Sequence, residues 1–148
     1  LLTFVIGQGD VLVTPVQVVQ MMNIIATRGN TNIPHFYLDN DPEEVTLSLE
    51  SKTWDFLQTT TWQVVNHKNG TGKSARIPAA DVHGKTGTAQ VCSDCDVEPH
   101  GWFAGFIELN NGKKYTICII IENGGKGSGK PTKMAKEIFQ YIIGLDNV

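Results

Sequence analysis

Two β-prone runs separated by a short turn place the strongest constraint on the fold. GWFAGFIEL and KKYTICIIIE are rich in aromatic and β-branched residues, and Asn110–Gly112 lies between them. Such residues favour strands, and a short Asn/Gly turn between two strand-like runs favours a hairpin. We therefore expect two antiparallel neighbouring strands. The run VHGKTGTAQV, which is made of small and β-tolerant residues, predicts a third strand before them.

Helical patterns flank these strands. Thr14 is suited to cap a helix that begins at Pro15 and continues until Gly29. Its apolar residues recur at helical spacing and are Val18, Val19, Met22, Ile25 and Ala26. The following stretch, NIPHFYLDNDPEE, is polar and turn-rich, and it predicts a surface connection.

Two more helices complete the pattern. The second is expected to start at Ser48, with Glu50 in its first turn, and to end in the loop NHKNGTGKSARIPAAD. The side chains that it presents toward a core are Leu49, Trp54, Leu57, Trp62 and Val65. The third follows the glycine-rich segment GGKGSGKP, and its apolar face consists of Met134, Ala135, Ile138, Phe139 and Ile142. The expected fold class is α+β, an antiparallel sheet packed with helices.

The strand before the hairpin contains Lys85–Thr88, a Lys-Thr-Gly-Thr run. An ammonium group and two hydroxyls form a compact cationic platform with hydrogen-bond donors, which suits a carboxylate. Because side chains alternate along a strand, we expect Thr86 and Thr88 on one face and Lys85 and Gly87 on the other. Gly87 lets a ligand or another backbone approach closely. Taken in isolation, the same four residues also fit a polar edge strand without a function.

Composition narrows the range of partners. The formal net charge is -3 and the basic residues are scattered, so the sequence offers neither a basic stripe for nucleic acid nor a cationic amphipathic face for a membrane. The longest apolar runs, such as Ile117–Ile121, are far shorter than the roughly 20 residues of a membrane span. The start, LLTFVIGQGD, lacks the basic residues and the cleavage site of a signal peptide. The sequence calls for no cofactor.

Two glycine-rich segments raise nucleotide binding as an alternative function. HKNGTGKS ends like a phosphate-binding loop, but His67 stands where that motif requires its first glycine. GGKGSGKP has the glycines but ends in Pro131 instead of Ser or Thr. A nucleotide-binding module therefore stays a remote alternative.

Several blocks, in order along the chain, resemble a known family. They are IGQGDVLVTPVQVVQMMNIIATRGN, WQVVNHKNGTGKSA, HGKTGTAQV, HGWFAGFIELNNGKKYTICIIIENGG and the final helix. From Gly7 to about Ile143, the chain resembles the C-terminal part of the transpeptidase domain of class B penicillin-binding proteins. The Gly-Gln-Gly loop before Thr-Pro and the IENGG segment look most like the elongation-type (penicillin-binding protein 2-like) enzymes. A class D β-lactamase-like protein or a β-lactam sensor domain is the alternative, because KTGT followed by GWFAGFIE is also similar to those.

The resemblance implies a role for each residue of the motif. Lys85 places positive charge at a serine acyl-transfer site, and Thr86 and Thr88 bind the carboxylate of a stem peptide or a β-lactam. The backbone N–H of Thr88 helps to form the oxyanion hole. Gly84 and Gly87 keep the strand thin enough for substrate to pair along it as an added strand.

The nucleophile that this chemistry needs is not found in the sequence. The family combines Ser-x-x-Lys and Ser-x-Asn elements with Lys-Thr-Gly. No serine has Lys three places on or Asn two places on, among Ser48, Ser51, Ser74, Ser93 and Ser128. We therefore expect residues 1–148 to be the C-terminal portion of a transpeptidase domain, with the serine half and a membrane anchor upstream of Leu1. The isolated chain is expected to be inactive.

The resemblance also implies a function for the parent protein. It is expected to be a serine D,D-transpeptidase that cross-links peptidoglycan stem peptides ending in D-Ala-D-Ala, supports cell shape and is acylated by β-lactams. Its expected location is the cell inner membrane, on the periplasmic or extracytoplasmic face. Its expected partners are the upstream half of the same domain and a peptidoglycan glycosyltransferase, with no nucleic acid.

Three further residues leave alternatives open. Cys92 and Cys95 form a C-x-x-C after the motif strand, which fits a local disulfide, two free thiols or part of a metal site. With His100 they give only three ligands of the four that a tetrahedral site needs, so a metal is not expected. Trp102 is expected either to pack in the core or to stack on substrate.

Overall fold

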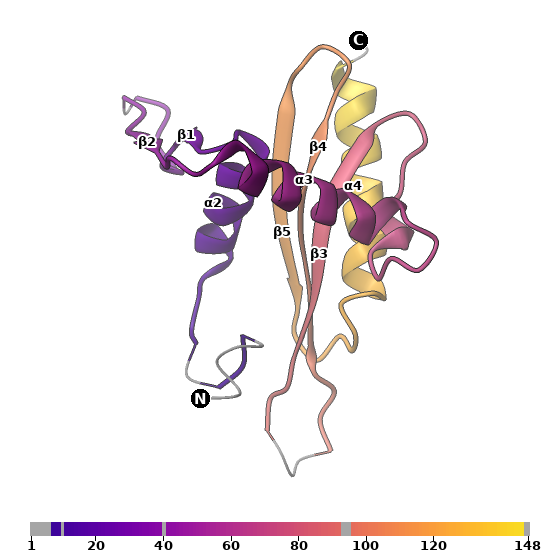
Figure 1. Ribbon diagram of the computed structural model, residues 1–148. Coiled ribbons are helices and arrows are strands. Elements are labelled where there is room, and N and C mark those ends of the chain that lie inside the picture. Colours follow the sequence, from indigo (N-terminus) through magenta and orange to yellow (C-terminus); the bar gives the residue numbers. More distant parts are fainter. Residues whose placement is uncertain (1–6, 10, 40, 93–95, 147–148) are drawn as a thin grey trace.

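A three-stranded antiparallel sheet forms the centre of the computed structural model, which describes residues 7–9, 11–39, 41–92 and 96–146. Its strands are β3 (Asp81–Ala89), β4 (His100–Glu108) and β5 (Lys114–Ile121), in the order β3-β4-β5 (Figure 1). The expected hairpin between β4 and β5 is confirmed. Its turn is closed by the hydrogen bond from Gly112 N to Leu109 O, and Gly112 has a φ of 82°, which suits glycine.

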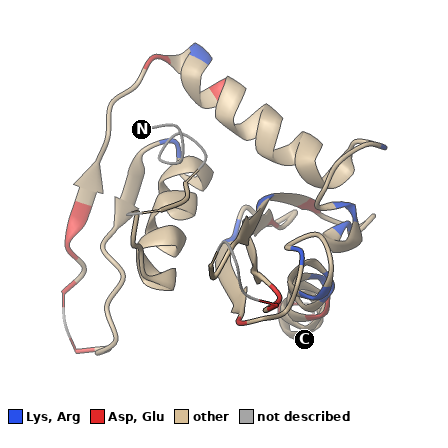
Figure 2. Ribbon diagram, turned by 90° about the horizontal axis from the view of Figure 1, so that it is seen from below, with Lys and Arg blue, Asp and Glu red and all other residues tan. Residues whose placement is uncertain are grey.

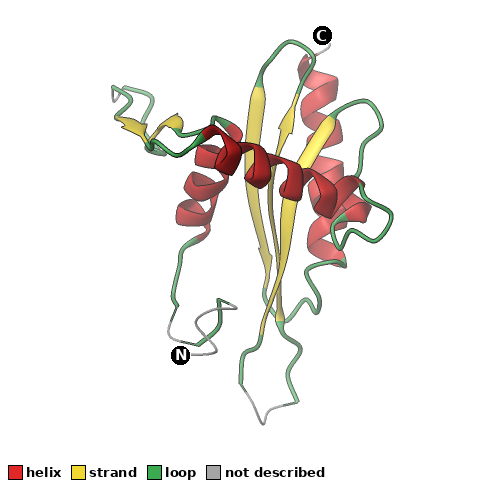
Figure 3. Ribbon diagram, in the orientation of Figure 1, coloured by secondary structure: helices red, strands yellow, loops and turns green. Residues whose placement is uncertain are grey.

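Helices cover both faces of the sheet (Figure 3). Helix α2 (Pro15–Ala26) packs on β4 and β5, and α3 (Ser51–Asn66) packs on β3. Helix α4 (Lys130–Asp146) packs on the opposite face, together with the short 3₁₀ helix η1 (Lys73–Ala75) (Figure 2). The expected α+β class, an antiparallel sheet packed with helices, is confirmed.

Alternation along β4 supplies a separate core to each side of the sheet. Phe103 and Ile107 point toward α4, where they pack with the buried Phe139. Ala104 and Phe106 point the other way and pack against α2. Because successive side chains of a strand point to opposite faces, one apolar strand can serve two cores. This explains why GWFAGFIEL reads as an almost continuous apolar run.

Helix α2 begins as expected. The hydroxyl of Thr14 accepts a hydrogen bond from Gln17 N at 3.3 Å, and the side chain of Gln17 accepts one from Thr14 N at 2.8 Å, which forms a capping box. The helix ends at Ala26, three residues before the expected end. Arg28 and Gly29 have φ values of 55° and 95°, so the chain leaves the helix there through a left-handed turn.

The predictions of where α3 begins and of two side chains that it buries are wrong. The helix begins at Ser51, not Ser48, because Leu47 N pairs with Gly29 O at 2.9 Å and holds the chain extended. Leu49 is therefore outside the helix and 41% exposed, and Trp62 is 38% exposed. Trp54 and Val65 are buried as expected.

The expected surface connection is more ordered than the sequence indicates. Two strands of three residues each, β1 (Asn30–Asn32) and β2 (Glu44–Thr46), pair in antiparallel fashion at its two ends. Their sequences, NTN and EVT, are too short and too polar to predict a strand, although Val45 and Thr46 are β-branched. The pair projects from the end of α2 (Figure 1), and the end of β1 lines a small pocket together with residues 114–116 of β5.

The apolar face of α4 is rotated from its expected position. Ala135 and Phe139 are buried, but Met134 and Ile138 are 44% and 37% exposed. Thr132 is fully buried instead, and its hydroxyl donates a hydrogen bond to Gly127 O. A buried threonine is invisible to a hydrophobic pattern, which is why the rotation was missed. No helix in the described part of the chain is both long enough and apolar enough to span a bilayer.

Candidate functional site

The Lys-Thr-Gly-Thr motif occupies the second half of β3, and its side chains divide between two faces as expected. Thr86 and Thr88 lie on the α4 side of the sheet. The hydroxyl of Thr86 is 2.8 Å from that of Thr71, and the hydroxyl of Thr88 accepts a hydrogen bond from Gly127 N at 3.3 Å. Lys85 lies on the other face, beside Ala104, its partner across the strand pair.

The backbone of the two threonines points to the outer edge of β3. The carbonyl of Thr86 accepts a hydrogen bond from Lys85 Nζ at 2.7 Å, and that of Thr88 accepts one from Gln8 Nε2 at 3.2 Å. In an antiparallel pair, a residue directs its N–H and its C=O to the same side. The Thr88 N–H therefore also points away from β4. Within the described residues this edge pairs with no strand, so an extended chain could pair along it.

A cavity of about 400 Å³ lies beside this end of the motif. One wall is formed by residues 7–9 and 11–13, before α2, and the other by residues 87–90 with His100 and Trp102. Trp102 is half-buried and faces the cavity, opposite Gly87. The structure thus brings together Gly87, Thr88 and Trp102, three of the residues singled out in the sequence.

The glycine-rich loop before α4 supports the motif from behind. A side chain at Gly127 would overlap the carbonyl oxygens of Gly87 and Trp102, so only glycine fits. Its N–H is donated to the Thr88 hydroxyl, which leaves the hydroxyl proton of Thr88 available for a ligand. In the sequence the glycines of this loop suggest phosphate binding, and nothing there indicates this contact, which joins residues 39 positions apart.

Lys85 gives the site an uncompensated positive charge. Its side chain is exposed, and none of the four ion pairs among the described residues includes it. The other Lys and Arg residues are distributed over several elements (Figure 2). An ammonium group that reaches an open strand edge, with two hydroxyls on the other face of the same strand, suits a carboxylate-bearing ligand.

The two glycines of the motif strand have different surroundings. A Cβ at Gly84 would lie 2.5 Å from Cζ of Phe103, so Gly84 makes room for a core side chain. A Cβ at Gly87 would meet only Trp102, at 3.2 Å from its Cβ. The core thus accounts for Gly84 by itself, and the expectation that Gly84 and Gly87 keep the strand thin enough for a paired substrate stays a prediction.

The cysteines are in different states. Cys92 is disulfide-bonded, while Cys95 lies outside the described residues, so the Cys92–Cys95 pairing stays a prediction. Cys118 is a free thiol on β5 that packs against α2. Its burial raises its pKa to about 11. Among the described residues, no cluster of three or more His, Cys, Asp or Glu side chains could hold a metal ion.

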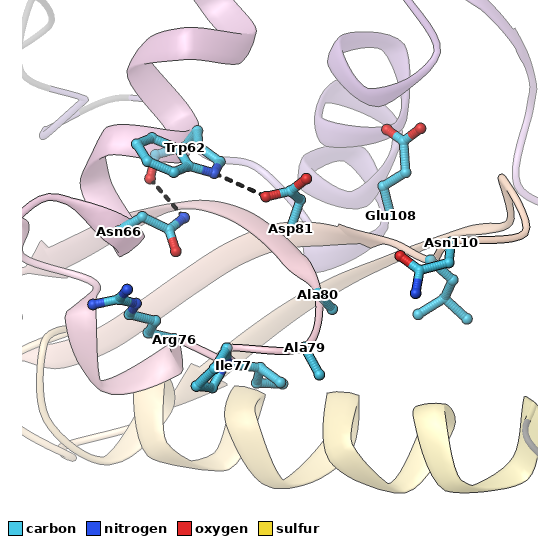
Figure 4. A pocket seen from close by; sticks show the side chains of 11 residues that line it. Trp62, Asn66, Arg76, Ile77, Ala79, Ala80, Asp81, Glu108 and Asn110 are labelled. Atoms are coloured by element: carbon cyan, nitrogen blue, oxygen red, sulfur yellow. Dashed lines mark hydrogen bonds between the residues drawn. The ribbon is translucent and has the colours of Figure 1, made fainter.

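A larger cavity, of about 570 Å³, lies at the opposite end of β3 (Figure 4). Trp62 donates its indole N–H to Asp81 at 3.1 Å beside it, and Asn66 donates to the carbonyl of Trp62 at 3.0 Å. Asp81 and Thr88 are seven residues apart in one strand, which corresponds to roughly 23 Å. This cavity is therefore separate from the Lys-Thr-Gly-Thr motif, and the sequence analysis did not identify it.

Comparison with known proteins identifies the family. The family described as "Penicillin binding protein transpeptidase domain" matches residues 2–143. The chain belongs to this family. It is 30% identical, over 93% of its length, to the peptidoglycan D,D-transpeptidase MrdA of Haemophilus influenzae, of which it covers 25%. The chain thus spans about a quarter of that relative.

Two solved structures support the same assignment. One is a complex between penicillin-binding protein 2 and MreC from Helicobacter pylori, with a TM-score of 0.74 and 33% identity over 95% of this chain and 27% of that one. The other is a peptidoglycan synthase complex, with a TM-score of 0.79 and 28% identity over 93% of this chain and 25% of that one. The expected resemblance to penicillin-binding protein 2 is confirmed.

Proposed function

We propose that this chain is the C-terminal part of a serine D,D-transpeptidase domain and provides its substrate-binding strand. The observation that supports this most directly is the outer edge of β3, where the uncompensated ammonium of Lys85 and the outward-facing N–H of Thr88 lie together, with the hydroxyls of Thr86 and Thr88 on the adjoining α4 face. The nucleophilic serine is proposed to come from a segment upstream of Leu1. That serine half would complete the site beside the cavity at Gly87 and Trp102.

The proposed reaction is acyl transfer. The serine hydroxyl attacks the carbonyl carbon between the two D-alanines of a stem peptide, its proton passes through a base to the departing amine, and the terminal D-Ala leaves. The amine of a second stem peptide then attacks the ester, which forms the cross-link and restores the serine. A β-lactam takes the place of the first peptide, and its ring opens instead of releasing a leaving group.

Each motif residue has a proposed part in this reaction. Lys85 keeps the site positive, and the hydroxyls of Thr86 and Thr88 bind the ligand carboxylate. The Thr88 N–H donates to the developing oxyanion, an interaction typically worth about 3 kcal/mol of transition-state stabilisation. The side-chain amide of Gln8 donates a hydrogen bond to the Thr88 carbonyl. A substrate chain that pairs along β3 would displace Gln8 and donate its own N–H to this carbonyl.

The wider setting of the parent protein is also proposed. We place it at the cell inner membrane through an upstream anchor, with this domain on the periplasmic or extracytoplasmic face. Its proposed partners are peptidoglycan stem peptides, β-lactam antibiotics and a peptidoglycan glycosyltransferase. The solved relatives support the proposal that the parent works in a complex with a glycosyltransferase. One is described as a complex with MreC, and the other as a peptidoglycan synthase complex that coordinates polymerization and crosslinking.

Labelling with a fluorescent penicillin tests the proposal. The parent protein with its upstream half should retain the label after denaturation, whereas residues 1–148 alone should not. Covalent label on the isolated chain would show that one of its own serines is the nucleophile. Absence of label on the parent, at penicillin concentrations that label a known transpeptidase, would contradict the proposed function.

A further inference from the structure

His83 lies two residues before Lys85 on the same face of β3 and is half-buried between α3 and β4. Its ring stacks on that of Phe106, with centroids 4.3 Å apart and planes 13° apart. Its Nδ1 is 3.1 Å from the backbone oxygen of Gln58 and 3.3 Å from the hydroxyl of Thr61. Because a carbonyl oxygen can only accept, the hydrogen of the neutral ring is on Nδ1.

Gln58 extends this connection to a second helix. Its side-chain Nε2 donates to Ile25 O at 3.0 Å and to Ala26 O at 3.4 Å, at the end of α2. Ile25 O also accepts from Arg28 N at 3.3 Å and Ala26 O from Lys114 Nζ at 2.9 Å, so Gln58 shares the end of α2 with the following turn and with β5. One residue of α3 thus holds α2 with its side chain and β3 with its backbone.

These bonds connect the elements that carry the two walls of the cavity, and they reach α2 at its C-terminal end, the end away from the wall-forming loop. Residues 7–9 and 11–13 form one wall, and residues 11–13 lead through Thr14 into α2; the opposite wall is the end of β3. Helix α2 packs on β4 and β5, whereas α3 packs on β3, so α3 bridges the elements that carry the two walls. Asn66 adds a further bond from α3 to β3, donating to Val82 O at 2.8 Å.

We propose that neutral His83 is a positioning residue that, through Gln58, sets the placement of the Lys85–Thr88 strand relative to α2 and the loop before it. His83 does not touch the cavity and acts only through the strand that carries the motif. This inference rests on the proposed function. Misplacement of a reacting group by about 1 Å can cost about 100-fold in rate, so a small shift of β3 is sufficient to matter.

The surroundings of His83 favour its neutral form. Burial lowers its pKa from 6.5 and outweighs the opposing effects of the Gln58 hydrogen bond and of two carboxylates, Asp81 on β3 and Glu108 on β4. The ammonium of Lys114 on β5 lowers the pKa further. Since the unfolded chain takes up the proton first, the stabilisation from neutral His83 is present above pH 6.5 and is lost as pH falls through the lower pKa of the folded state.

Two substitutions of His83 in the intact transpeptidase separate the hydrogen bond from the bulk of the ring. His83→Asn places an amide nitrogen where Nδ1 lies, so the bond to Gln58 is kept. His83→Leu keeps an apolar side chain against Phe106 but has no donor. The acylation rate per active site is measured with a penicillin, with the active fraction determined by burst titration, so that loss of folded protein does not enter the rate.

We expect His83→Leu to lower the acylation rate constant by about 10- to 100-fold and His83→Asn to retain it within about threefold. The acylation rate of the wild type should fall when acid protonates His83. In His83→Asn this fall should occur at lower pH, because asparagine does not take up a proton in that range. His35→Asn, the same substitution in the exposed segment between β1 and β2, is the matched control and should leave both the rate and the pH profile unchanged.

A double-mutant cycle with Gln58→Leu tests the route through α3. That change removes the Gln58 donor to Ile25 and Ala26, while Lys114 still donates to Ala26 O, and it leaves the backbone oxygen of Gln58 that holds His83. If the two residues act through one connection, the double variant should lose less than the product of the two single losses. Strictly multiplicative losses would contradict the route.

The outcomes separate this proposal from the function on which it rests. If the wild-type protein is not acylated at all, the proposed function fails. If it is acylated, and His83→Leu reacts at the wild-type rate with the wild-type pH profile, the positioning role alone is overturned. Equal losses for His83→Leu and His83→Asn would likewise overturn it, because the bond to Gln58 would then not matter.

Discussion

The backbone N–H of Gly127 donates a hydrogen bond to the hydroxyl of Thr88 at 3.3 Å, so the loop before α4 holds the second threonine of the motif from the side opposite the cavity. The same glycine is fixed in turn by the buried hydroxyl of Thr132, which donates to its carbonyl. The start of α4 is thereby connected to the outer edge of β3. Changes in this loop should reach the motif without any contact with a ligand.

The first prediction concerns Gly127→Ala. The new methyl group would overlap the carbonyls of Gly87 and Trp102, so the loop must move and the bond to Thr88 should be lost. We expect a loss of about 1–3 kcal/mol in the free energy of unfolding, the usual cost of overpacking, together with slower acylation of the parent protein. Chemical denaturation and labelling with a fluorescent penicillin measure the two effects.

Gly144→Ala is the control for this change. Gly144 lies in α4 with no atom within 4 Å of the position of a new Cβ. Alanine should stabilise the helix there by about 0.5–1 kcal/mol and leave acylation unchanged. If Gly127→Ala behaved like Gly144→Ala, the loop would not support the motif.

The second prediction concerns the thiol of Cys118. Burial raises its pKa to about 11, and the thiolate is the form that reacts with alkylating agents. Alkylation of Cys118 by iodoacetamide in the folded protein should therefore be slow at pH 8 and should accelerate about tenfold per pH unit up to about pH 11. Peptide mapping follows the reaction at this residue. Equal rates in the folded and the urea-unfolded protein would refute the buried environment.

Much of the fold follows from local sequence. The strand runs, the Asn110–Gly112 turn and the cap at Thr14 act over a few residues, so their signals are complete within the segment itself. The predictions failed where a distant contact decides the outcome. The start of α3 is set by the pairing of Leu47 with Gly29, and the buried face of α4 includes a threonine. Neither effect has a local pattern.

The same distinction applies to the candidate site. Strand alternation was enough to predict that Thr86 and Thr88 share a face opposite Lys85. The contacts that shape the site join residues far apart in the sequence, with Gln8 and Thr88 80 positions apart and His83 and Gln58 25 apart. The sequence assigns His83 no role, because nothing near it in the chain shows that an α3 carbonyl lies opposite its ring.

The third prediction concerns the two cysteines that follow the motif strand. If Cys92 and Cys95 are bridged, the intact mass of the protein should be lower by two hydrogens than that of the reduced form and should recover on reduction. Mass spectrometry with and without reductant decides this. A stoichiometric zinc signal that disappears in Cys95→Ser would reject the disulfide in favour of a metal site.

The last prediction separates the work of Lys85 from that of Thr88 in the parent enzyme. Lys85→Ala removes the uncompensated ammonium of the motif and should depress acylation severely. Thr88→Ala removes a hydroxyl but keeps the backbone N–H at the strand edge. It should cost roughly 1.5–3 kcal/mol, the range for a hydrogen bond to a charged group, which is about 10- to 150-fold in the acylation rate by carboxylate-bearing β-lactams.

A β-lactam whose carboxylate has been esterified provides the control, because the charged partner of the hydroxyl is then gone. Thr88→Ala should therefore slow acylation by the ester much less than acylation by the acid, measured as second-order rate constants on the same enzyme. Equal losses for acid and ester would mean that Thr88 does not bind the carboxylate. Wild-type acylation in Lys85→Ala would mean that the Lys-Thr-Gly-Thr run is only a polar edge strand.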